Sequence, residues 1–319
     1  MYRREFSAKN EGEIFMLNFR VKTFLCACKH MNFTNAAAEL GISQPAVSQH
    51  IHHLEEDYGV KLFQYEGKKL HLTREGKLML SAVQTINNDE HILRQRLQAM
   101  KTNRKMYCFG ATHTIGDYLI ADQLAELLRQ HPEYNVDIYI ADTAKLLEDI
   151  DAGNIDFAIV EGFFDHSRYE TLRFSTERLI CVCGPDYEIP EEIRPEELFQ
   201  HRIIAREKTA GSRELLDKAL ATINFSVDSF HSHVIVGTPY AVKALAVRNC
   251  GLAFLYESSV MEELESGRLR RVKIRHFEPL YNFTFLWKSG SMYKEDFIKM
   301  YKKLAGKKAE MPTCSRNFT

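Results

Sequence analysis

The apolar positions near the N-terminal end of the chain follow a helical period in two short segments that a glycine separates. Small apolar residues at 36–38 form the first segment, and Gly41 follows, where a residue that tolerates a positive φ suits a turn. In the second segment, Val47, Ile51 and Leu54 are four and three residues apart, so they share one face of a helix. The pattern predicts two packed helices joined by a tight turn.

Capping residues predict where these two helices begin. Thr34 is expected to cap the first helix and Ser43 the second, because each hydroxyl can accept a hydrogen bond from a free backbone N–H of the first turn. Pro45 lies in the first turn of the second helix, where its missing N–H breaks no helical bond. The polar face of the second helix carries Gln44, Ser48, Gln49, His52 and His53. Two such helices are typical of a helix-turn-helix, whose second helix lies in the major groove of DNA.

An alternating segment follows the second helix. An apolar run at 60–63 is separated from a strand-like run at 70–72 by Gly67, Lys68 and Lys69. Lysines at the tip of a two-stranded wing suit a contact with phosphate beside the groove. The turn alone fits any pair of packed helices equally well, and the wing favours DNA binding.

Together these segments resemble the DNA-binding domain of LysR-type transcriptional regulators. The matching positions are Phe24, 32–41, 43–48, 54–55, 59–63 and 72–76. The resemblance is close over roughly the N-terminal third of the chain and architectural beyond it. It implies that Thr34, Ser43, Gln44, Pro45, Ser48, Gln49, His52, His53, Lys68 and Lys69 contact DNA.

Three residues depart from the family pattern on the expected reading helix. Gln49 stands where arginine is common, and His52 and His53 stand where arginine or lysine is usual. Neutral histidines bring less charge to the phosphates. We therefore expect weaker and more pH-dependent DNA binding than in a typical member.

Thr73 is expected to cap a long helix that runs to about Met100. Its seam positions are alternately four and three residues apart, and they are Met79, Val83, Ile86, Glu90, Leu93, Leu97 and Met100. At about 1.5 Å per residue the helix is on the order of 40 Å long. We expect the apolar seam residues to pair with a second copy, giving a homodimer or homotetramer. A dimer supplies two reading heads for a palindromic operator.

After a short polar hinge, strand-like apolar runs alternate with amphipathic helices in two cycles. The expected strands lie at 107–111, 136–140, 157–160, 179–183, 202–205, 234–236, 252–255 and 283–287. Such alternation predicts an α/β fold with mostly parallel sheet and helices on both faces. The residues predict two α/β lobes, and the resemblance implies a periplasmic-binding-protein-like effector domain.

These patterns give the expected domain organisation. It comprises an N-terminal extension without order (1–16), a winged helix-turn-helix (17–75), a linker and dimerisation helix (76–103), an effector-binding domain (104–305) and a tail without order (306–319). Lobe I is expected at about 104–176 and 280–305, and lobe II at about 177–279. The resemblance makes Met16 a second candidate start besides Met1.

Ligands of open parallel sheets lie beyond the carboxyl ends of the strands, where helix N-termini favour anions. The candidate effector contacts at such positions are Thr112, His113, Thr114, Thr143, Arg206, Ser212, Gly237 and Thr238. Arg206 would supply a cation from the second lobe. We expect a small, anionic effector between the lobes. In the alternative, the threonines are plain N-caps and Arg206 forms a surface ion pair with Glu207.

Composition fits a DNA-binding domain on a neutral body. The 319 residues are 45% hydrophobic and 27% charged with a net charge of −1, so a DNA contact must come from a local patch. The seven cysteines show no zinc-type CxxC spacing, and we expect buried free thiols in a reducing cytoplasm. No signal peptide or membrane-spanning run is evident. We expect no metal and no cofactor.

The leading interpretation is a cytoplasmic DNA-binding transcriptional regulator without catalytic residues. Its expected partners are double-stranded operator DNA, a small-molecule effector, further copies of itself and, as a further candidate, RNA polymerase. An enzyme that carries a DNA-binding domain is the first alternative, but the chain lacks GxxxxGK[ST], GxSxG, HExxH and GxGxxG motifs. A transporter's solute-binding protein is the second, and the helix-turn-helix opposes it. The loop at 206–214 resembles that of members governing sulfur assimilation, while the effector and the sign of regulation stay open.

Overall fold

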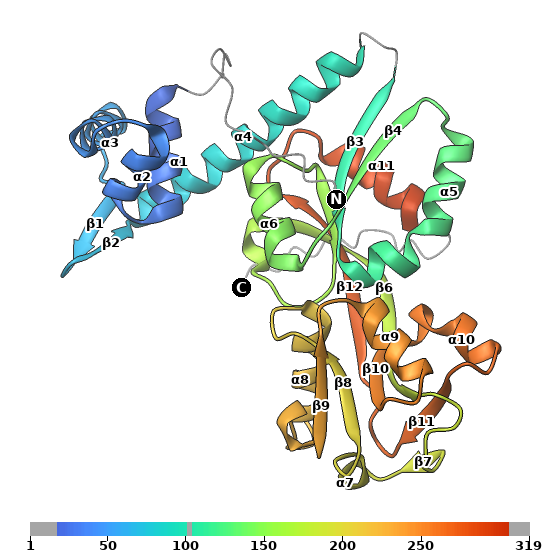
Figure 1. The fold of residues 1–319 in the computed structure, drawn as a ribbon. Coiled ribbons are helices and arrows are strands. Elements are labelled where there is room, and N and C mark those ends of the chain that lie inside the picture. Colours follow the sequence, from blue (N-terminus) through green and yellow to red (C-terminus); the bar gives the residue numbers. More distant parts are fainter. Residues whose placement is uncertain (1–17, 101–103, 306–319) are drawn as a thin grey trace, which may run out of the picture. The chain divides into compact units, whose positions relative to one another are not determined.

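The computed structural model describes residues 18–100 and 104–305, in an N-terminal unit (residues 1–90) and a C-terminal unit (residues 91–319) (Figure 1). The N-terminal unit contains α1 (Phe19–His30), α2 (Phe33–Leu40), α3 (Gln44–Tyr58), β1 (Phe63–Glu66), β2 (Lys69–Leu72) and the first part of α4 (Arg74–Met100). The boundary between the units therefore lies within α4. The predicted extension (1–16) and tail (306–319) lie outside the described residues.

Three helices of the N-terminal unit pack around one apolar core. The core contains Phe24, Ala36, Ala37, Val47, Ile51, Leu54 and Leu62. Because alanines form the α2 side of this contact, α3 packs close to α2. The predicted apolar face of α3 is confirmed, since Val47, Ile51 and Leu54 are all buried.

The helix starts follow the predicted capping chemistry with one exception. The predicted Thr34 cap is wrong: Asn32 caps α2, and its side-chain oxygen accepts hydrogen bonds from the backbone N–H groups of Thr34 (2.8 Å) and Asn35 (3.1 Å). Ser43 caps α3 as predicted, with its hydroxyl accepting from the N–H of Ala46 at 3.3 Å. Gly41 has the positive φ (66°) that the turn requires.

A two-stranded wing of β1 and β2 is tied to α3 and α4 by polar groups. The Glu55 carboxylate on α3 accepts hydrogen bonds from the backbone N–H groups of Leu62 (2.9 Å) and Phe63 (3.4 Å) at the start of β1. The Thr73 hydroxyl donates to the carbonyl oxygen of Lys61 at 2.6 Å and accepts from the N–H of Gly76 at 2.9 Å. Thr73 therefore caps α4, as its position predicts.

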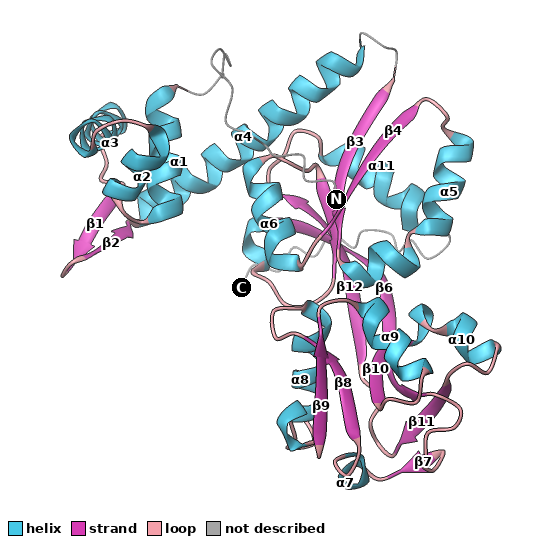
Figure 2. Cartoon of the chain, viewed as in Figure 1, coloured by secondary structure: helices cyan, strands magenta, loops and turns pink. Residues whose placement is uncertain are grey.

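The C-terminal unit consists of two α/β lobes on one continuous sheet (Figure 2). The first lobe contains β3 (Lys105–Ala111), a π-helix (Ile115–Leu119), α5 (Ala121–Gln130), β4 (Tyr134–Ile140), α6 (Thr143–Ala152), β5 (Phe157–Val160), β12 (Leu280–Lys288) and α11 (Lys294–Ala305). The second contains β7 (Glu192–Ile193), α7 (Pro195–Leu198), β8 (Arg202–Arg206), α8 (Gly211–Ala221), β9 (Ser232–Val236), α9 (Pro239–Val247), β10 (Leu252–Tyr256), α10 (Met261–Glu265) and β11 (Arg270–Ile274). Both lobes share β6 (Tyr169–Cys183).

The sheet has the strand order β4-β3-β5-β12-β6-β10-β8-β9. The outer strands of each lobe are parallel, as predicted, whereas β12 runs antiparallel to both β5 and β6. The first part of β6 pairs with β12, and its last residues pair with β10 and β11. The predicted strand at 179–183 is therefore only the end of a 15-residue strand that joins the lobes.

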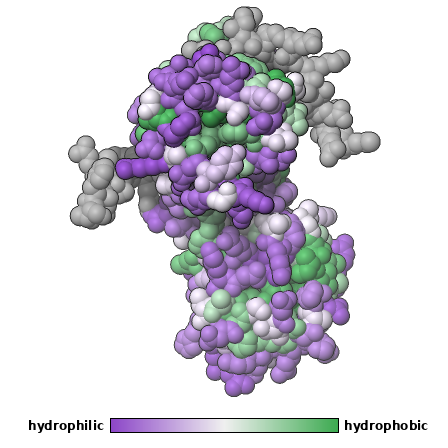
Figure 3. Space-filling view, turned by 90° about the vertical axis from the view of Figure 1, so that its left-hand side faces the viewer, coloured by the Kyte–Doolittle hydropathy of each residue, from purple (hydrophilic) through white to green (hydrophobic). Residues whose placement is uncertain are grey.

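The surface of the second lobe, which is the lower one in Figure 3, carries apolar areas among mostly hydrophilic side chains. On α4, Ile86, Leu97 and Met100 from the predicted seam are 49%, 53% and 75% exposed in the single chain. Among the described residues, no helix combines the length and apolar character that a membrane span needs.

A substitution at Gly76 tests the contact between α4 and the wing. An added Cβ would lie 2.1 Å from the backbone carbonyl oxygen of Leu62, which no side-chain rotation relieves. We expect Gly76→Ala to lower the free energy of unfolding by at least the roughly 1–3 kcal/mol of an overpacked core, measured by chemical denaturation followed by circular dichroism. The exposed Ser81→Ala on the same helix is the control. Equal stability of both variants would contradict this contact.

Candidate DNA-binding surface and effector cleft

The polar face of α3 lies opposite the buried face that packs against α1 and α2. Among the ten predicted DNA contacts, nine are exposed and His53 is half-buried; the exposed ones are Thr34, Ser43, Gln44, Pro45, Ser48, Gln49, His52, Lys68 and Lys69. The caps at Asn32 and Ser43 leave the start of α3 at the surface, with Gln44 and Ser48 one helical turn apart.

A groove of about 650 Å³ separates α3 from the wing. Ser48, Gln49 and His52 line it on the α3 side, and Gln64 and Tyr65 line it on the β1 side. The two β1 residues were missed from sequence. On β1, Phe63 is buried and the three residues after it are exposed, so Gln64 and Tyr65 are open to a partner.

The basic charge of this surface is limited by an acidic residue on the same helix. The Glu56 carboxylate lies 3.2 Å from both His52 Nε2 and His53 Nδ1. At the wing, Lys68 and Lys69 are exposed beside Gly67, whose φ is 63°. The lysines are therefore placed for phosphate contact, while Glu56 partly offsets any charge that the histidines carry.

Between the two lobes, three of the eight predicted effector contacts meet around a small cavity of about 20 Å³. Thr114 comes from the π-helix turn of the first lobe, and Arg206 and Ser212 come from the end of β8 and the start of α8 in the second. Apolar side chains complete the lining, among them Leu179, Leu216 and Tyr256. Such a volume holds about one water molecule, so a larger ligand requires the lobes to separate.

Arg206 is buried and already paired with two carboxylates. Its Nη2 lies 2.7 Å from Glu207 Oε1 and 3.6 Å from Asp142 Oδ1 in the first lobe. The Arg206 guanidinium holds the pKa of the Glu207 carboxyl below its usual range. The alternative interpretation expected an ion pair between Arg206 and Glu207 at the surface. The ion pair exists, but it is buried, because Arg206 is only 6% exposed.

The remaining predicted contacts have different surroundings. Thr238 is a plain N-cap, whose hydroxyl accepts from the N–H of Ala241 at 3.2 Å. Thr143 instead donates to the backbone oxygen of Glu161 at 2.6 Å, so it is no cap. Gly237 and Thr238 precede Pro239, and of these three Pro239 lines the cavity. Thr112 is buried, and its hydroxyl has no hydrogen-bond partner among the described residues.

A buried carboxyl group at the junction of the lobes was missed from sequence. Glu161 follows β5 and is 3% exposed, and its Oε1 accepts a hydrogen bond from the Thr114 hydroxyl at 3.2 Å. The Tyr256 hydroxyl of the second lobe lies close enough to affect its ionisation. Burial raises the pKa of Glu161 to about 7. A Cβ on Gly211 would lie 3.1 Å from the Glu161 backbone oxygen, so a glycine lets α8 approach this closely.

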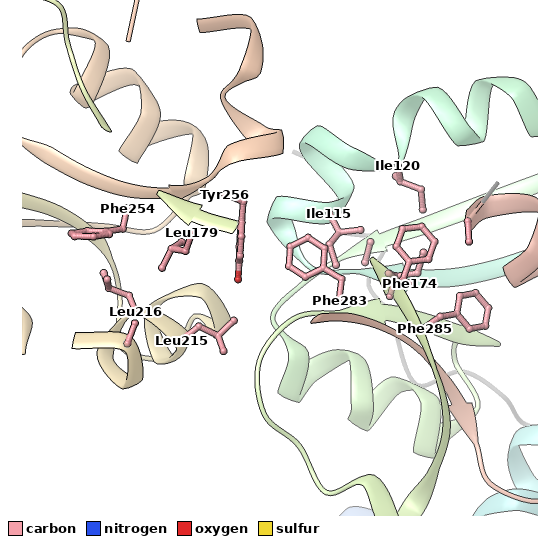
Figure 4. Packing of buried hydrophobic residues seen from close by; sticks show 14 of the residues in the cluster. Ile115, Ile120, Phe174, Leu179, Leu215, Leu216, Phe254, Tyr256, Phe283 and Phe285 are labelled. Atoms are coloured by element: carbon pink, nitrogen blue, oxygen red, sulfur yellow. The ribbon is translucent and has the colours of Figure 1, made fainter. Parts of the chain in front are cut away.

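The lobes also meet through an apolar cluster (Figure 4). The Tyr256 ring of β10 packs edge-on against Phe283 of β12, with ring centroids 4.8 Å apart. Ile115, Phe174 and Phe285 extend the cluster into the first lobe. Burial away from water disfavours the ionised carboxylate, which explains the raised pKa of Glu161.

Two protein-family models match this chain, one within the N-terminal unit and one within the C-terminal unit. The model for the lysR family of bacterial regulatory helix-turn-helix proteins matches residues 20–77, and the LysR substrate binding domain matches residues 101–302. The chain belongs to the LysR family of transcriptional regulators. It is therefore a DNA-binding regulator with an effector-binding domain, as the sequence predicts.

Curated relatives of this LysR-family regulator match it over most of their length. It is 26% identical over 293 residues to the HTH-type transcriptional regulator CysL of Bacillus subtilis (strain 168), covering 88% of this chain and 95% of CysL. It is 28% identical over 267 residues to the RuBisCO operon transcriptional regulator of Acidithiobacillus ferrooxidans, covering 81% and 83% of the two chains.

Solved structures of LysR-type regulators share the fold. Full-length LysG from Corynebacterium glutamicum, solved with bound effector Arg, aligns with a TM-score of 0.59 at 15% identity over 91% of this chain and 98% of LysG. The regulatory domain of CcmR from Synechocystis PCC6803, in complex with 2-PG, aligns with a TM-score of 0.57 at 15% identity over 64% and 99%. These likenesses confirm the two-lobed architecture.

The buried Glu161 predicts a pH dependence of stability in this regulator. Because its pKa is raised to about 7, the folded chain binds more protons than the unfolded chain between about pH 4.5 and 7, and the free energy of unfolding falls as pH rises through this window. We expect Glu161→Gln to make the fall in the free energy of unfolding with rising pH shallower. The measurement is denaturation of the protein at a series of pH values, followed by Trp287 fluorescence. Asp156, whose pKa burial raises to about 6, is common to both proteins and cancels in the comparison. The exposed Glu148→Gln is the control, and identical slopes for all three proteins would contradict the burial of an acidic Glu161.

Proposed function

We propose that this LysR-family regulator acts as a dimer or tetramer on a palindromic operator, with α3 of each copy in a major groove. The observation that carries this proposal is the exposed polar face of α3 beside the groove that Gln64 and Tyr65 line. Lys68 and Lys69 would contact the phosphate backbone beside it. Glu56 near both histidines supports modest intrinsic affinity for phosphate, so each reading head depends on a second one.

The seam of α4 supports the pairing of two copies. Ile86, Leu97 and Met100 expose apolar surface in the single chain, at spacings of eleven and three residues that return to one face of a helix. The other apolar residues of the predicted seam pack within the chain instead: Val83 is buried, Met79 lies against the core of the N-terminal unit, and Leu93 lies against the core of the C-terminal unit. The regulator would act in a reducing cytoplasm, which the free thiols of the six described cysteines support. It would contact RNA polymerase and would perform no catalysis.

We propose that the effector is a small anion that takes the place of Glu207 on Arg206. Two buried cations line the cavity, Arg206 and Arg213, and Arg213 is already held by the Asp217 carboxylate. The Arg206 guanidinium offers planar, bidentate recognition of a carboxylate or phosphate. Glu207 already satisfies that geometry from the same chain, with Nε–Oε2 and Nη2–Oε1 distances of 3.2 and 2.7 Å. An anion would exchange with this carboxylate while the lobes separate, which changes the lobe arrangement together with occupancy.

Alanine substitutions on α3 test the reading surface. An operator is first selected from random double-stranded DNA with the full chain. We expect Gln44→Ala and Ser48→Ala each to cost about 1–3 kcal/mol at the cognate operator and to relax base preference, because a base contact is lost. Lys68→Ala and Lys69→Ala should instead lower the slope of log affinity against log salt by about 0.9 per lost phosphate contact. If Gln44→Ala left both affinity and base preference unchanged, α3 would not be the reading helix.

Substitutions at the Arg206 pair test the effector proposal. We expect Glu207→Gln to bind small anions about tenfold more tightly, equivalent to about 1.4 kcal/mol, because a competing carboxylate is removed. The measurement is the rise in melting temperature, followed by Trp287 fluorescence, with sulfate, phosphate and small dicarboxylates. Arg206→Met should abolish the response. An unchanged response in both variants would place anion binding elsewhere.

A further inference from the structure

Three side chains with metal-binding chemistry converge in the N-terminal unit, away from the reading face of α3. Ligand atoms of Cys26, His30 and Glu39 all lie within 4.8 Å of one another. The sequence predicted no metal, because zinc motifs with paired cysteines are absent. We propose that Cys26, His30 and Glu39 form a binding site for Zn²⁺ that joins α1 to α2.

The packing of α1 against α2 creates this arrangement. Cys26 and His30 are four residues apart on α1, so their side chains lie on the same face of the helix. The Cys26 thiol donates a hydrogen bond to the Ala36 carbonyl oxygen of α2, with a sulfur-to-oxygen distance of 3.6 Å. Glu39 is three residues beyond Ala36, about one turn along α2, and its carboxylate therefore returns to the same side.

The donor set matches what zinc prefers. Thiolate, imidazole and carboxylate are its three common protein ligands, and three protein ligands with one water form an open tetrahedral site. Ligand atoms of such a site are about 3.5 Å apart, given metal–ligand distances of about 2.0–2.3 Å. Rotations of the His30 and Glu39 side chains would shorten the distances between the ligand atoms to this value. On binding, the Cys26 thiol becomes a thiolate and its proton passes to solvent.

A lysine and a histidine already contact the acidic member of this set. The Glu39 carboxylate lies 2.8 Å from Lys29 Nζ and 2.6 Å from His30 Nε2. Hydrogen bonds from Lys29 and His30 hold the pKa of the Glu39 carboxyl below its usual range, so it is available as an anionic ligand. The Lys29 side chain is 65% exposed, so it can turn to solvent when a metal ion takes its place. Lys29 is therefore the direct competitor of the metal.

A metal at this position would act on the support of the reading helix. α1 contacts both α2 and α3, and the Thr23 hydroxyl of α1 lies 3.0 Å from His50 Nδ1 of α3. Joining α1 and α2 more firmly would therefore stabilise the helices on which α3 rests. This consequence does not depend on the effector cleft.

Metal titration of the full chain tests the site. We expect Zn²⁺ to slow amide hydrogen exchange in peptides from Phe19–Leu40, and Co²⁺ to give the near-ultraviolet absorption of a thiolate complex. Glu39→Gln, at an exposed carboxylate, should weaken binding by more than about 100-fold, since changes outside the ligands alone cost about 10–100-fold. Lys29→Met should tighten binding, because it removes the competing cation. Cys28→Ser, on the same helix but outside the cluster, is the matched control and should bind as the wild type does.

The outcomes separate this site from surface histidines. Loss of the Co²⁺–thiolate band in Cys26→Ser, with tighter binding by Lys29→Met, supports the proposal even if Cys26→Ser is itself less stable. Binding that Glu39→Gln and Lys29→Met leave unchanged, but that a His52→Ala, His53→Ala variant removes, would overturn it. So would the absence of any Zn²⁺-dependent slowing of exchange in Phe19–Leu40.

Discussion

The pairing of β6 with strands of both lobes is the constraint on which the effector domain depends. This strand pairs with β12 in the first lobe and with β10 and β11 in the second, so neither sheet is complete without it. The chain passes from one lobe to the other a second time just before β12. This second crossing lies directly beside β6, where the Leu179 N–H donates to the Pro279 carbonyl oxygen at 3.0 Å. Any movement between the lobes would therefore be centred on these two adjacent crossings, and it would disturb the apolar cluster that the lobes share.

Charged groups from both lobes neutralise one another at the cavity between them. The cavity is therefore not an open cationic site. Arg206 is neutralised by Glu207 of its own lobe and Asp142 of the other, and Glu161 is buried next to Thr114 and Tyr256. Separation of the lobes would hydrate Glu161 and remove the cause of its raised pKa. The proposed entry of an effector between the lobes would therefore be linked to proton release from this carboxyl.

Sequence reasoning located elements whose apolar residues follow a clear period, and it failed where tertiary contacts decide. The helices of the N-terminal unit were predicted from Val47, Ile51 and Leu54, but the cap of α2 was assigned to Thr34 because the equally suitable Asn32 lies only two residues earlier. Residues 169–178 of β6 were missed, since that stretch is largely polar and its pairing with β12 comes from far along the chain. Thr114, Arg206 and Ser212 were predicted and meet at the cavity. Glu161 was not predicted, because its burial depends on the approach of Gly211 from the second lobe.

Regulation by an effector bound between the lobes requires that the arrangement of the lobes controls how α3 meets DNA. Ser212 lines the small cavity at the start of α8, so Ser212→Trp would hold the lobes apart without any knowledge of the effector. The measurement is nuclease footprinting of the full-length wild type, Ser212→Ala and Ser212→Trp on one selected operator. The account predicts that Ser212→Trp alone changes the length of the protected region or the affinity. Identical footprints and affinities for three folded proteins would contradict it.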